Sequence, residues 1–469
     1  MNAQSEWDGN GIFDIAIIGA GVVGCAAARR FALAGAKVIL IEKGSDILSG
    51  ASKANSAILH TGFDAPKNSL ELSLVQAGRQ EYLDIHQSMN LPLVETGALV
   101  CAWTPEEALK LEEIAEQGRQ NGVDRLRLLN SVEARAVEPG LSENIVAALH
   151  VFDEHVIDPW SAPLAYVQQA IALGAVVLRQ CEVRSGQFDG EWKLETNRGE
   201  VRAKSVINAA GLFGDHVDAR LGFSPEFQIK PRKGQFVVLD KAASRQLKTI
   251  VLPVPNEITK GIVVCPTAFG NILVGPTAEE QDDRIRATVE HDTLDALVKH
   301  GTKLVPGLAH IPVTAVYAGL RPASEKKEYR VINRPEYNAI TLGGIRSTGL
   351  SAALGLAQHA LELHGGASRG EFQQKNAPDV HMPNLAESRQ RDWQAPEHGE
   401  IVCHCEMVTR REIEATLTSP LPPGDFGGLR RRTRAGMGRC QGFYCNAKLA
   451  EISKGCLTTP LAMDQEGGK

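Results

Sequence analysis

Four cysteines near the end of the chain have the residue type and the spacing of a metal or iron–sulfur site. Cys403 and Cys405 are separated by one residue, and Cys440 and Cys445 are separated by four. A disulfide between Cys403 and Cys405 would close a small, strained ring, so ligation is the better interpretation. Four thiolates suit either a zinc ion or a [2Fe–2S] cluster, although zinc sites more often use cysteines with two residues between them.

A second chemical signal lies near the N-terminus, in "FDIAIIGAGVVGCAAARRFALAGAKVILIEK". The two apolar runs predict buried parallel strands, and the Ala-rich text between them predicts a helix. Gly19, Gly21 and Gly24 have the G-x-G-x-x-G spacing, which permits a tight turn, the approach of a pyrophosphate and close helix–strand packing. Glu42 ends the second run and can accept a hydrogen bond from a ribose hydroxyl. This unit predicts a dinucleotide site.

Three later segments favour FAD over a nicotinamide dinucleotide. They are "ASKANSAILHTGFDAP" (51–66), "AKSVINAAGLFGD" (203–215) and "NAITLGGIRSTGLSAALGLAQHAL" (338–361). The last is a strand, a Gly-rich turn and a helix, and a ligand that touches both ends of a chain must be long. Besides the glycines and Glu42, the expected FAD contacts are Ser52, Asn55, Ser56, Val183, Ala210, Gly211, Gly344, Ser347, Thr348, Gly349 and Leu350.

Residues 13 to about 365 resemble the D-amino-acid-oxidase/glycerol-3-phosphate-dehydrogenase superfamily of flavoproteins, through "NSAILHTG", "PRKGQFVVLD", "GNILVGPTAEE", "AGLRPAS" and "GIRSTGLSAALGLA". The likeness is greatest to the glycerol-3-phosphate and L-2-hydroxyglutarate dehydrogenase branch. It implies an α/β and α+β chain with a Rossmann-like FAD-binding domain in discontinuous segments and a mixed-sheet substrate domain. The expected segments are 13–84, 151–219 and 326–366 for the FAD-binding domain, and 85–150 and 220–325 for the substrate domain.

The C-terminal text "VCHCEMVTRREIEATL" and "GLRRRTRAGMGRCQGFYC" resembles the bacterioferritin-associated-ferredoxin-like [2Fe–2S] domain. This resemblance favours iron over zinc and implies a small helical domain over 399–455, after a linker over 367–398. The basic run of Arg430, Arg431, Arg432, Arg434 and Arg439 has three readings. It could be a solvated face, offset the negative charge of the cluster, or steer an acidic electron acceptor.

In such an enzyme the flavin takes a hydride, a base takes the hydroxyl proton, and cations hold the substrate anion. The resemblance places the base at His60, whose alternative role is a hydrogen bond within its loop. It places a substrate-binding arginine at Arg321, and Arg346 is the second candidate; each could instead pair with a structural acid. Phe269 replaces a residue that is often polar in this branch, so the pocket would be more apolar if this side chain faced the substrate.

Composition limits the remaining functions. A chain of 469 residues should form about two or three domains, and its net charge of −6 argues against a general nucleic-acid binder. The sequence shows no apolar stretch that would span a bilayer and no basic, apolar secretory start, which predicts a cytoplasmic protein with reduced thiols. Peripheral membrane contact stays open.

These observations predict a dehydrogenase with FAD and a [2Fe–2S] cluster that oxidises a small anionic hydroxy compound, glycerol 3-phosphate or a 2-hydroxy acid. Electrons would leave singly through the cluster to a protein or a quinone. Two alternatives are a secondary-amine or amino-acid dehydrogenase, and a flavin electron-transfer subunit without a substrate. The sequence names neither the substrate nor the acceptor.

Overall fold

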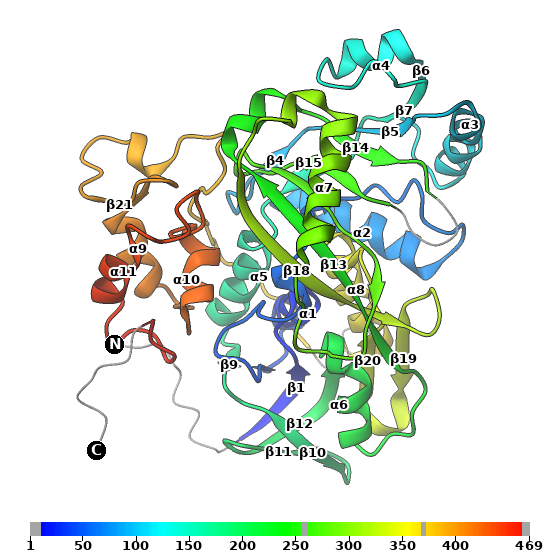
Figure 1. Cartoon of the computed structure of the whole chain (residues 1–469). Helices are drawn as coiled ribbons and strands as arrows, with labels where there is room; N and C mark the ends of the chain where they lie inside the picture. The colour runs from blue at the N-terminus through cyan, green and yellow to red at the C-terminus, as the bar shows by residue number, and fades with distance from the viewer. Residues whose placement is uncertain (1–10, 256–260, 367–371, 462–469) are drawn as a thin grey trace.

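The computed structural model describes residues 11–255, 261–366 and 372–461 (Figure 1). The predicted βαβ unit is present at the start of the described chain. Its elements are β1 (Ile12–Ile18), α1 (Val22–Ala34) and β2 (Val38–Ile41). The four residues of β2 are all buried, as a strand in the middle of a parallel sheet requires.

The first sheet has the strand order β10-β11-β12-β1-β2-β9, and the long strand β12 also pairs with β20, which in turn pairs with β19. β1, β2, β9, β12 and β20 run parallel where they pair, whereas β10, β11 and β19 add antiparallel edges. The additional strands are β9 (Val176–Leu178), β10 (Val183–Phe188), β11 (Trp192–Thr196), β12 (Gly199–Asn208), β19 (Arg330–Arg334) and β20 (Ala339–Gly343).

Helices cover this sheet and form the largest apolar core with it. α1 packs against α5 (Ser161–Ala172) and α8 (Gly349–His364), and α8 packs against α2 (Leu70–Ile85). The approach of α2 to α8 depends on Gly78, where a Cβ atom would lie 2.2 Å from the carbonyl oxygen of Ser351. The short helix α6 (Gly214–Arg220) lies beside β10 and β20.

The second sheet has the order β17-β13-β16-β15-β14-β5-β7-β6, and β18 pairs along the whole of β13. β14 and β5 pair in parallel and the other pairs are antiparallel, so this sheet is mixed as predicted. α3 and α4 lie against β6 and β7, and α7 lies against β13 and β16. The bounds are β5 (Ala98–Ala102), α3 (Pro105–Gln120), β6 (Leu126–Asn130), α4 (Ser131–Val137), β7 (Ala147–Val151), β13 (Ile229–Leu239), β14 (Ile250–Pro253), β15 (Val263–Pro266), β16 (Ile272–Gly275), β17 (Glu279–Glu280), α7 (His291–Leu304) and β18 (Val313–Ser324).

A three-stranded sheet, β3 (Ile58–Leu59), β8 (His155–Ile157) and β4 (Leu93–Val94), lies where the chain crosses between the two larger sheets. β3 and β8 pair antiparallel, with Leu59 opposite His155. This pairing brings the loop after β3 beside the residues that precede β8. Both loops contribute to the candidate active site.

The C-terminal part, orange to red in Figure 1, packs beside α5. It contains the hairpin β21 (Ile401–Cys403) and β22 (Val408–Thr409), and the helices α9 (Arg410–Leu417), α10 (Phe426–Thr433) and α11 (Asn446–Ile452). Thr409 and Glu412 form a capping box at the start of α9, and Asp425 caps α10. The small helical domain predicted here is present, with its own apolar core.

The described part of the connecting segment, 372–398, has little regular structure, but it is packed against the rest of the protein. Met382 and Leu385 are buried, and the backbone N–H of Met382 donates to the carbonyl oxygen of Met89 at 3.0 Å. Lys375 N–H similarly donates to Leu33 O at 2.8 Å. Within the described residues, no helix is both long and apolar enough to cross a membrane.

Candidate active site and iron–sulfur centre

The turn between β1 and α1 requires glycine at two of the three predicted positions. Gly19 has φ +103°, and a Cβ atom on it would lie 2.7 Å from the carbonyl oxygen of Ala209. A Cβ atom on Gly24 would lie 1.9 Å from the carbonyl oxygen of Gly19, so only glycine lets α1 pack this closely on the strand. Gly21 caps the N-terminus of α1, and the next amide, that of Val22, donates to Ser52 Oγ at 3.0 Å.

Glu42 lies immediately after β2, as predicted. Its Oε2 atom accepts the backbone N–H of Ala20 at 2.8 Å, and its Oε1 atom accepts that of Gly44 at 2.7 Å. Burial raises the pKa of this carboxyl, and the two backbone donors oppose that effect. The carboxylate therefore holds the glycine turn in place, and each oxygen keeps a second lone pair that a ribose hydroxyl could use.

A cavity runs from this turn towards β18 and the start of α8. Of the predicted FAD contacts it is lined by Gly21, Ser52, Asn55, Ser56, Gly211, Ser347, Gly349 and Leu350. Gly234 and Gly319 also line it and were not predicted, although both lie within the quoted segments "PRKGQFVVLD" and "AGLRPAS". A Cβ atom on Gly319 would lie 2.6 Å from Cβ of Ala54, so this glycine brings β18 against the loop that follows β2. We call this cavity the FAD cradle.

The other predicted contacts lie beside the cradle or further from it. Val183 is buried in β10, and Ala210 follows β12 next to Ala209, which lines the cradle. Gly344 adopts φ +62° against the side chain of Arg330. Thr348 is the N-cap residue of α8, and its hydroxyl lies 2.6 Å from Tyr329 OH and 2.7 Å from Glu71 Oε1.

A second cavity adjoins the FAD cradle and shares Ser56, Pro276, Arg321, Arg346 and Ser347 with it. His60 lines this second cavity, in the loop after β3. Its Nδ1 atom lies 2.9 Å from Glu154 Oε2, and the Glu154 side chain is fully buried while that of His60 is 24% exposed. Thr61 also holds Glu154, through its N–H at 2.6 Å and its hydroxyl at 2.8 Å. Glu154 was not predicted from the sequence, because no local motif marks it.

Arg321 reaches the same cavity from β18, and its contacts are with backbone carbonyls. One guanidinium nitrogen donates to Lys233 O at 3.0 Å and to Thr277 O at 2.6 Å. No ion pair joins Arg321 to a carboxylate within the described residues. Burial, with repulsion from Arg232 and Arg346, lowers its pKa to about 10. The alternative of a pairing with a structural acid is therefore not what the structure shows.

Arg346 also lines both cavities, from the turn between β20 and α8. Its backbone has φ +42°, which is uncommon for a residue with a side chain and is found mainly where structure around it fixes the conformation. The described residues provide no carboxylate within ion-pair distance of it. Two guanidinium groups thus line one cavity that Asp64 and Glu71 also line, and within the described residues neither arginine is in an ion pair. An anion is therefore a complementary ligand for the two arginines.

The structure also decides whether Phe269 faces the substrate pocket. Phe269 does not line either cavity: it is buried, stacks on Trp160 and lies under the guanidinium of Arg434, so its apolar character does not bear on the substrate. Lys233 lines neither cavity and is buried in ion pairs with Glu279 and Glu290.

The four cysteines come together as two pairs of thiols. The thiol of Cys405 interacts with that of Cys440, and the thiol of Cys403 interacts with that of Cys445. A Cβ atom on Gly438 would lie 2.4 Å from that of Cys405, so the chain passes close to this cysteine only because residue 438 is glycine. Within the described residues, no group of three or more His, Cys, Asp or Glu side chains is placed around one metal ion. Two pairs of thiols are what a two-iron cluster requires, since each iron takes two protein ligands.

The loop between Cys440 and Cys445 supplies backbone donors to one of these sulfurs. The N–H of Tyr444 contributes most to lowering the pKa of Cys440, and those of Gly442 and Phe443 act in the same direction. Such donors stabilise a thiolate, the form that ligates metal. Cys405 and Cys440 are partly exposed, whereas Cys403 and Cys445 are buried. The pair of Cys405 and Cys440 is therefore the one nearer to the protein surface.

The arginine run does not form a solvated face, which corrects one of its predicted readings. Arg431, Arg432 and Arg434 are buried. Arg432 contacts Asp46 Oδ2 at 2.5 Å and Oδ1 at 3.0 Å, and Arg431 donates to Ile47 O at 3.1 Å. The remaining members are Arg434, which pairs with Glu406 at 2.8 Å; Arg430, which donates to Gly436 O at 2.8 Å; and the more exposed Arg439, which pairs with Asp240 at 2.9 Å.

The FAD cradle, the adjoining cationic cavity and the paired thiols define a flavoprotein oxidoreductase with an iron–sulfur domain. Residues 14–363 match the FAD dependent oxidoreductase family, and residues 401–454 match the BFD-like [2Fe-2S] binding domain. The chain belongs to this family of FAD-dependent oxidoreductases, and its cofactors are FAD and a [2Fe–2S] cluster. The predicted fold class and cofactors are confirmed.

Several known proteins are similar to it. A glycerol 3-phosphate dehydrogenase of Caloramator mitchellensis is 30% identical over 97% of both chains. A glycerol 3-phosphate oxidase of Mycoplasma pneumoniae is 30% identical over 75% of this chain and 94% of its own length. The structure of the dithionite-reduced L-alpha-glycerophosphate oxidase of that organism with FAD bound superposes with a TM-score of 0.74 at 27% identity, covering 80% of this chain and all of the other. Human mitochondrial L-2-hydroxyglutarate dehydrogenase is 28% identical over 57% of this chain and 61% of its own length.

Proposed function

We propose that this enzyme is a glycerol 3-phosphate dehydrogenase that sends its electrons out through the [2Fe–2S] cluster. The observation that carries the proposal is the composition of one cavity: a histidine backed by a buried carboxylate, and two arginines without a carboxylate partner among the described residues, next to the FAD cradle. A base and an anion site are what oxidation of a phosphorylated alcohol needs.

His60 is the proposed base. A carboxylate next to Nδ1 favours the tautomer that carries its proton on Nδ1. In this tautomer Nε2 has the lone pair that would accept the proton of the substrate hydroxyl. Glu154 then faces the imidazolium that forms, at 2.9 Å. FAD, when bound in the cradle, supplies the hydride acceptor. Loss of the hydroxyl proton to His60 and of a hydride from the carbon leaves a ketone.

Arg321 and Arg346 are the proposed phosphate site. Guanidinium groups bind phosphate oxygens in a planar, bidentate geometry, and both side chains line the cavity that His60 lines. Arg232, which pairs with Glu280, and Lys327 line it as well, as do the acids Asp64 and Glu71. A 2-hydroxy acid would use the same cations through its carboxylate, and it is the second substrate to test.

The iron–sulfur domain favours a glycerol 3-phosphate dehydrogenase over a glycerol 3-phosphate oxidase. The glycerol 3-phosphate dehydrogenase of Caloramator mitchellensis matches over 97% of this chain, whereas the two glycerol 3-phosphate oxidases match over 75%. The flavin takes two electrons per substrate and a [2Fe–2S] cluster takes one, so the cluster converts a pair into single electrons. An acceptor protein or quinone would approach on the side where Cys405 and Cys440 are partly exposed.

The test is an anaerobic substrate screen with loss of flavin absorbance as the readout. Glycerol 3-phosphate should bleach the flavin fastest and should then produce the paramagnetic signal of the reduced cluster. Faster bleaching by L-2-hydroxyglutarate would reassign the substrate to the 2-hydroxy acids. Bleaching only by a secondary amine such as sarcosine would contradict the proposed chemistry. If none of these compounds bleaches the flavin, the result favours the alternative of an electron-transfer subunit without a substrate.

A further inference from the structure

Three side chains from three parts of the chain form a stack between the FAD cradle and the iron–sulfur domain. The indole of Trp160, at the start of α5, donates to Lys53 O at 3.3 Å, next to Ser52 of the cradle. It stacks on Phe269, with ring centroids 5.5 Å apart and an interplanar angle of 12°. The guanidinium of Arg434 lies 4.0 Å from the centroid of the Phe269 ring. We call these three residues the interdomain stack.

The arginine end of the stack is tied to the thiols. Arg434 follows α10 in a left-handed conformation, φ +67°, and its Nε atom donates to Glu406 Oε2 at 2.8 Å. Glu406 is the neighbour of Cys405 in the chain. Two residues after Arg434, the backbone N–H of Gly436 donates to Cys403 Sγ at 3.4 Å. Arg434 is therefore connected to Cys405 through Glu406 and to Cys403 through Gly436.

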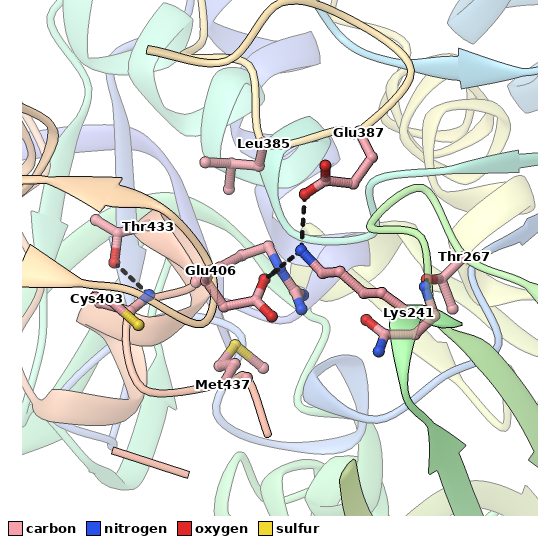
Figure 2. A network of polar contacts seen from close by, with 12 residues as sticks. Lys241, Thr267, Leu385, Glu387, Cys403, Glu406, Thr433 and Met437 are labelled. Carbon is pink, nitrogen blue, oxygen red and sulfur yellow. Dashed lines mark hydrogen bonds and ion pairs between the residues drawn. The ribbon is translucent and has the colours of Figure 1, made fainter. Parts of the chain in front are cut away.

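Glu406 joins the stack to a wider ion network, shown in Figure 2. Lys241 of the substrate-domain sheet region lies 3.1 Å from Glu406 Oε2 and 2.7 Å from Glu387 Oε1 of the connecting segment. Arg391 is almost fully buried and donates to Glu406 O at 3.4 Å and Glu387 Oε1 at 3.2 Å. Glu406 and Arg391 are buried in this network, and a buried charge that loses a partner is strongly destabilising, so the network favours one orientation of the domains.

We propose that the interdomain stack is a positioning contact: Phe269 and Arg434 hold the iron–sulfur domain at a fixed place against the flavin, so that electrons pass inside one rigid assembly and not through a swinging domain. This rests on the proposed function in taking the cluster as the electron route. Each substrate gives the flavin two electrons, the cluster passes them on one at a time, and two molecules of a one-electron acceptor, ferricyanide in the test, complete one turnover.

Two substitutions test the stack from its two sides. Phe269→Leu removes the ring that Trp160 and Arg434 contact while keeping an apolar side chain, and it lies outside the iron–sulfur domain. Arg434→Gln removes the guanidinium. Arg410→Gln is the matched control, because Arg410 pairs with Glu400 and Glu414 on the surface of the same small domain. Bound FAD, iron and sulfide are measured for every variant.

Two readouts are taken. In anaerobic rapid mixing with glycerol 3-phosphate, flavin reduction in Phe269→Leu should match the wild type, whereas appearance of the reduced-cluster signal should be at least tenfold slower. Without substrate, trypsin should cut the connecting segment 372–398 several-fold faster in both stack variants. The Arg410→Gln control should resemble the wild type in both readouts.

Cluster reduction at the wild-type rate in Phe269→Leu would overturn the proposal, whatever the cleavage rate. If Arg434→Gln loses iron, Phe269→Leu alone decides. If glycerol 3-phosphate does not reduce the wild-type flavin, the proposed substrate is wrong. The trypsin comparison alone then tests whether the interdomain stack is a positioning contact. In that case faster cleavage of Phe269→Leu supports the positioning contact and unchanged cleavage overturns it.

Discussion

The Nδ1 atom of His60 lies 2.9 Å from Oε2 of Glu154, a carboxylate whose side chain is fully buried. This pair predicts two graded losses. His60→Ala should keep FAD and lower the rate of flavin reduction about 100-fold or more, since that is the usual contribution of a general base. Glu154→Gln should keep His60 in place but weaken its hold on the proton, with a loss on the order of tenfold.

Rapid mixing with glycerol 3-phosphate measures both rates. Glu138→Gln is the matched control, because Glu138 is also buried and accepts backbone donors from Lys248 and Thr249 away from the cavity. If the His60→Ala variant reduces its flavin at the normal rate, His60 is not the base and has only the alternative role of a hydrogen bond within its loop.

Arg321 predicts a specific failure of the lysine substitution. Arg321→Lys and Arg321→Ala should both raise the half-saturating substrate concentration, by roughly tenfold to a hundredfold if hydrogen bonds to a charged ligand are worth about 1.5–3 kcal/mol. Lysine should recover little, because an ammonium cannot reproduce the planar fork. If both variants saturate as the wild type does, Arg346 becomes the main anion ligand.

The lowered pKa of Arg321 also predicts a pH limit to substrate binding. The pKa is about 10 in the empty site, and a bound anion favours the charged guanidinium and so raises it. Binding then takes up a proton above that pH, and the affinity should fall as the pH rises past about 10. The substrate dependence of flavin reduction between pH 8 and about 10.5 measures this fall, which should be absent in Arg321→Ala.

Gly24 predicts a steric loss of the FAD cradle. The methyl group of Gly24→Ala would lie 1.9 Å from the carbonyl oxygen of Gly19, so the helix must move away from the strand. Overpacking of this kind costs about 1–3 kcal/mol or more. We expect purified protein with less bound FAD and a lower melting temperature. In Gly50→Ala, the control, no described atom lies within 4 Å of the added methyl group, and FAD content should be normal.

The paired thiols predict a selective loss of the cluster. Cys405→Ser should remove or destabilise the [2Fe–2S] cluster, because it takes away one of four ligands, while FAD stays bound in a separate part of the fold. Iron and sulfide analysis and electron paramagnetic resonance of anaerobic protein measure the loss. Cys456→Ser, a substitution of an exposed cysteine outside the two pairs, should keep the cluster. Zinc in place of iron in the wild type would contradict the assignment.

The ion pairs of Asp46 predict that the protein loses stability in acid. Burial pushes its pKa up, but the pairs with Arg432, Arg431 and Arg179 outweigh burial, and the net pKa lies below the ordinary 3.8. The folded-state pKa is thus depressed, so this stabilisation is fully present above pH 3.8 and is lost as the pH falls through the folded-state value. Asp46→Asn should cost about 3–5 kcal/mol at neutral pH, because it leaves buried arginines without their counter-charge.

Denaturant unfolding at neutral and acid pH measures this effect, and the variant should lose less stability than the wild type below pH 3.8. Asp295→Asn, at an exposed position on α7, is the control and should change the free energy of unfolding little.

Local patterns were sufficient to predict the glycine turn of the FAD cradle and the ligation by the cysteines. The βαβ unit could be predicted because Gly19 and Gly24 are required by contacts within a single turn, helix and strand. The cysteine spacing indicated ligation for a similar reason, since Cys403 and Cys405 are neighbours along the chain. The resemblance to known flavoproteins then placed His60 and Arg321, which the structure brings to one cavity.

Only the tertiary structure showed which distant residues are the partners of His60 and of the arginine run. Glu154 is 94 positions from His60, and Asp46 is 386 positions from Arg432, so no sequence window contains either pair. For the same reason the arginine run was read partly as a solvated face, and Phe269 was considered as a pocket residue. Charge and apolarity are visible in a sequence, but whether a side chain is buried, and against which partner, is determined by the packing of distant segments.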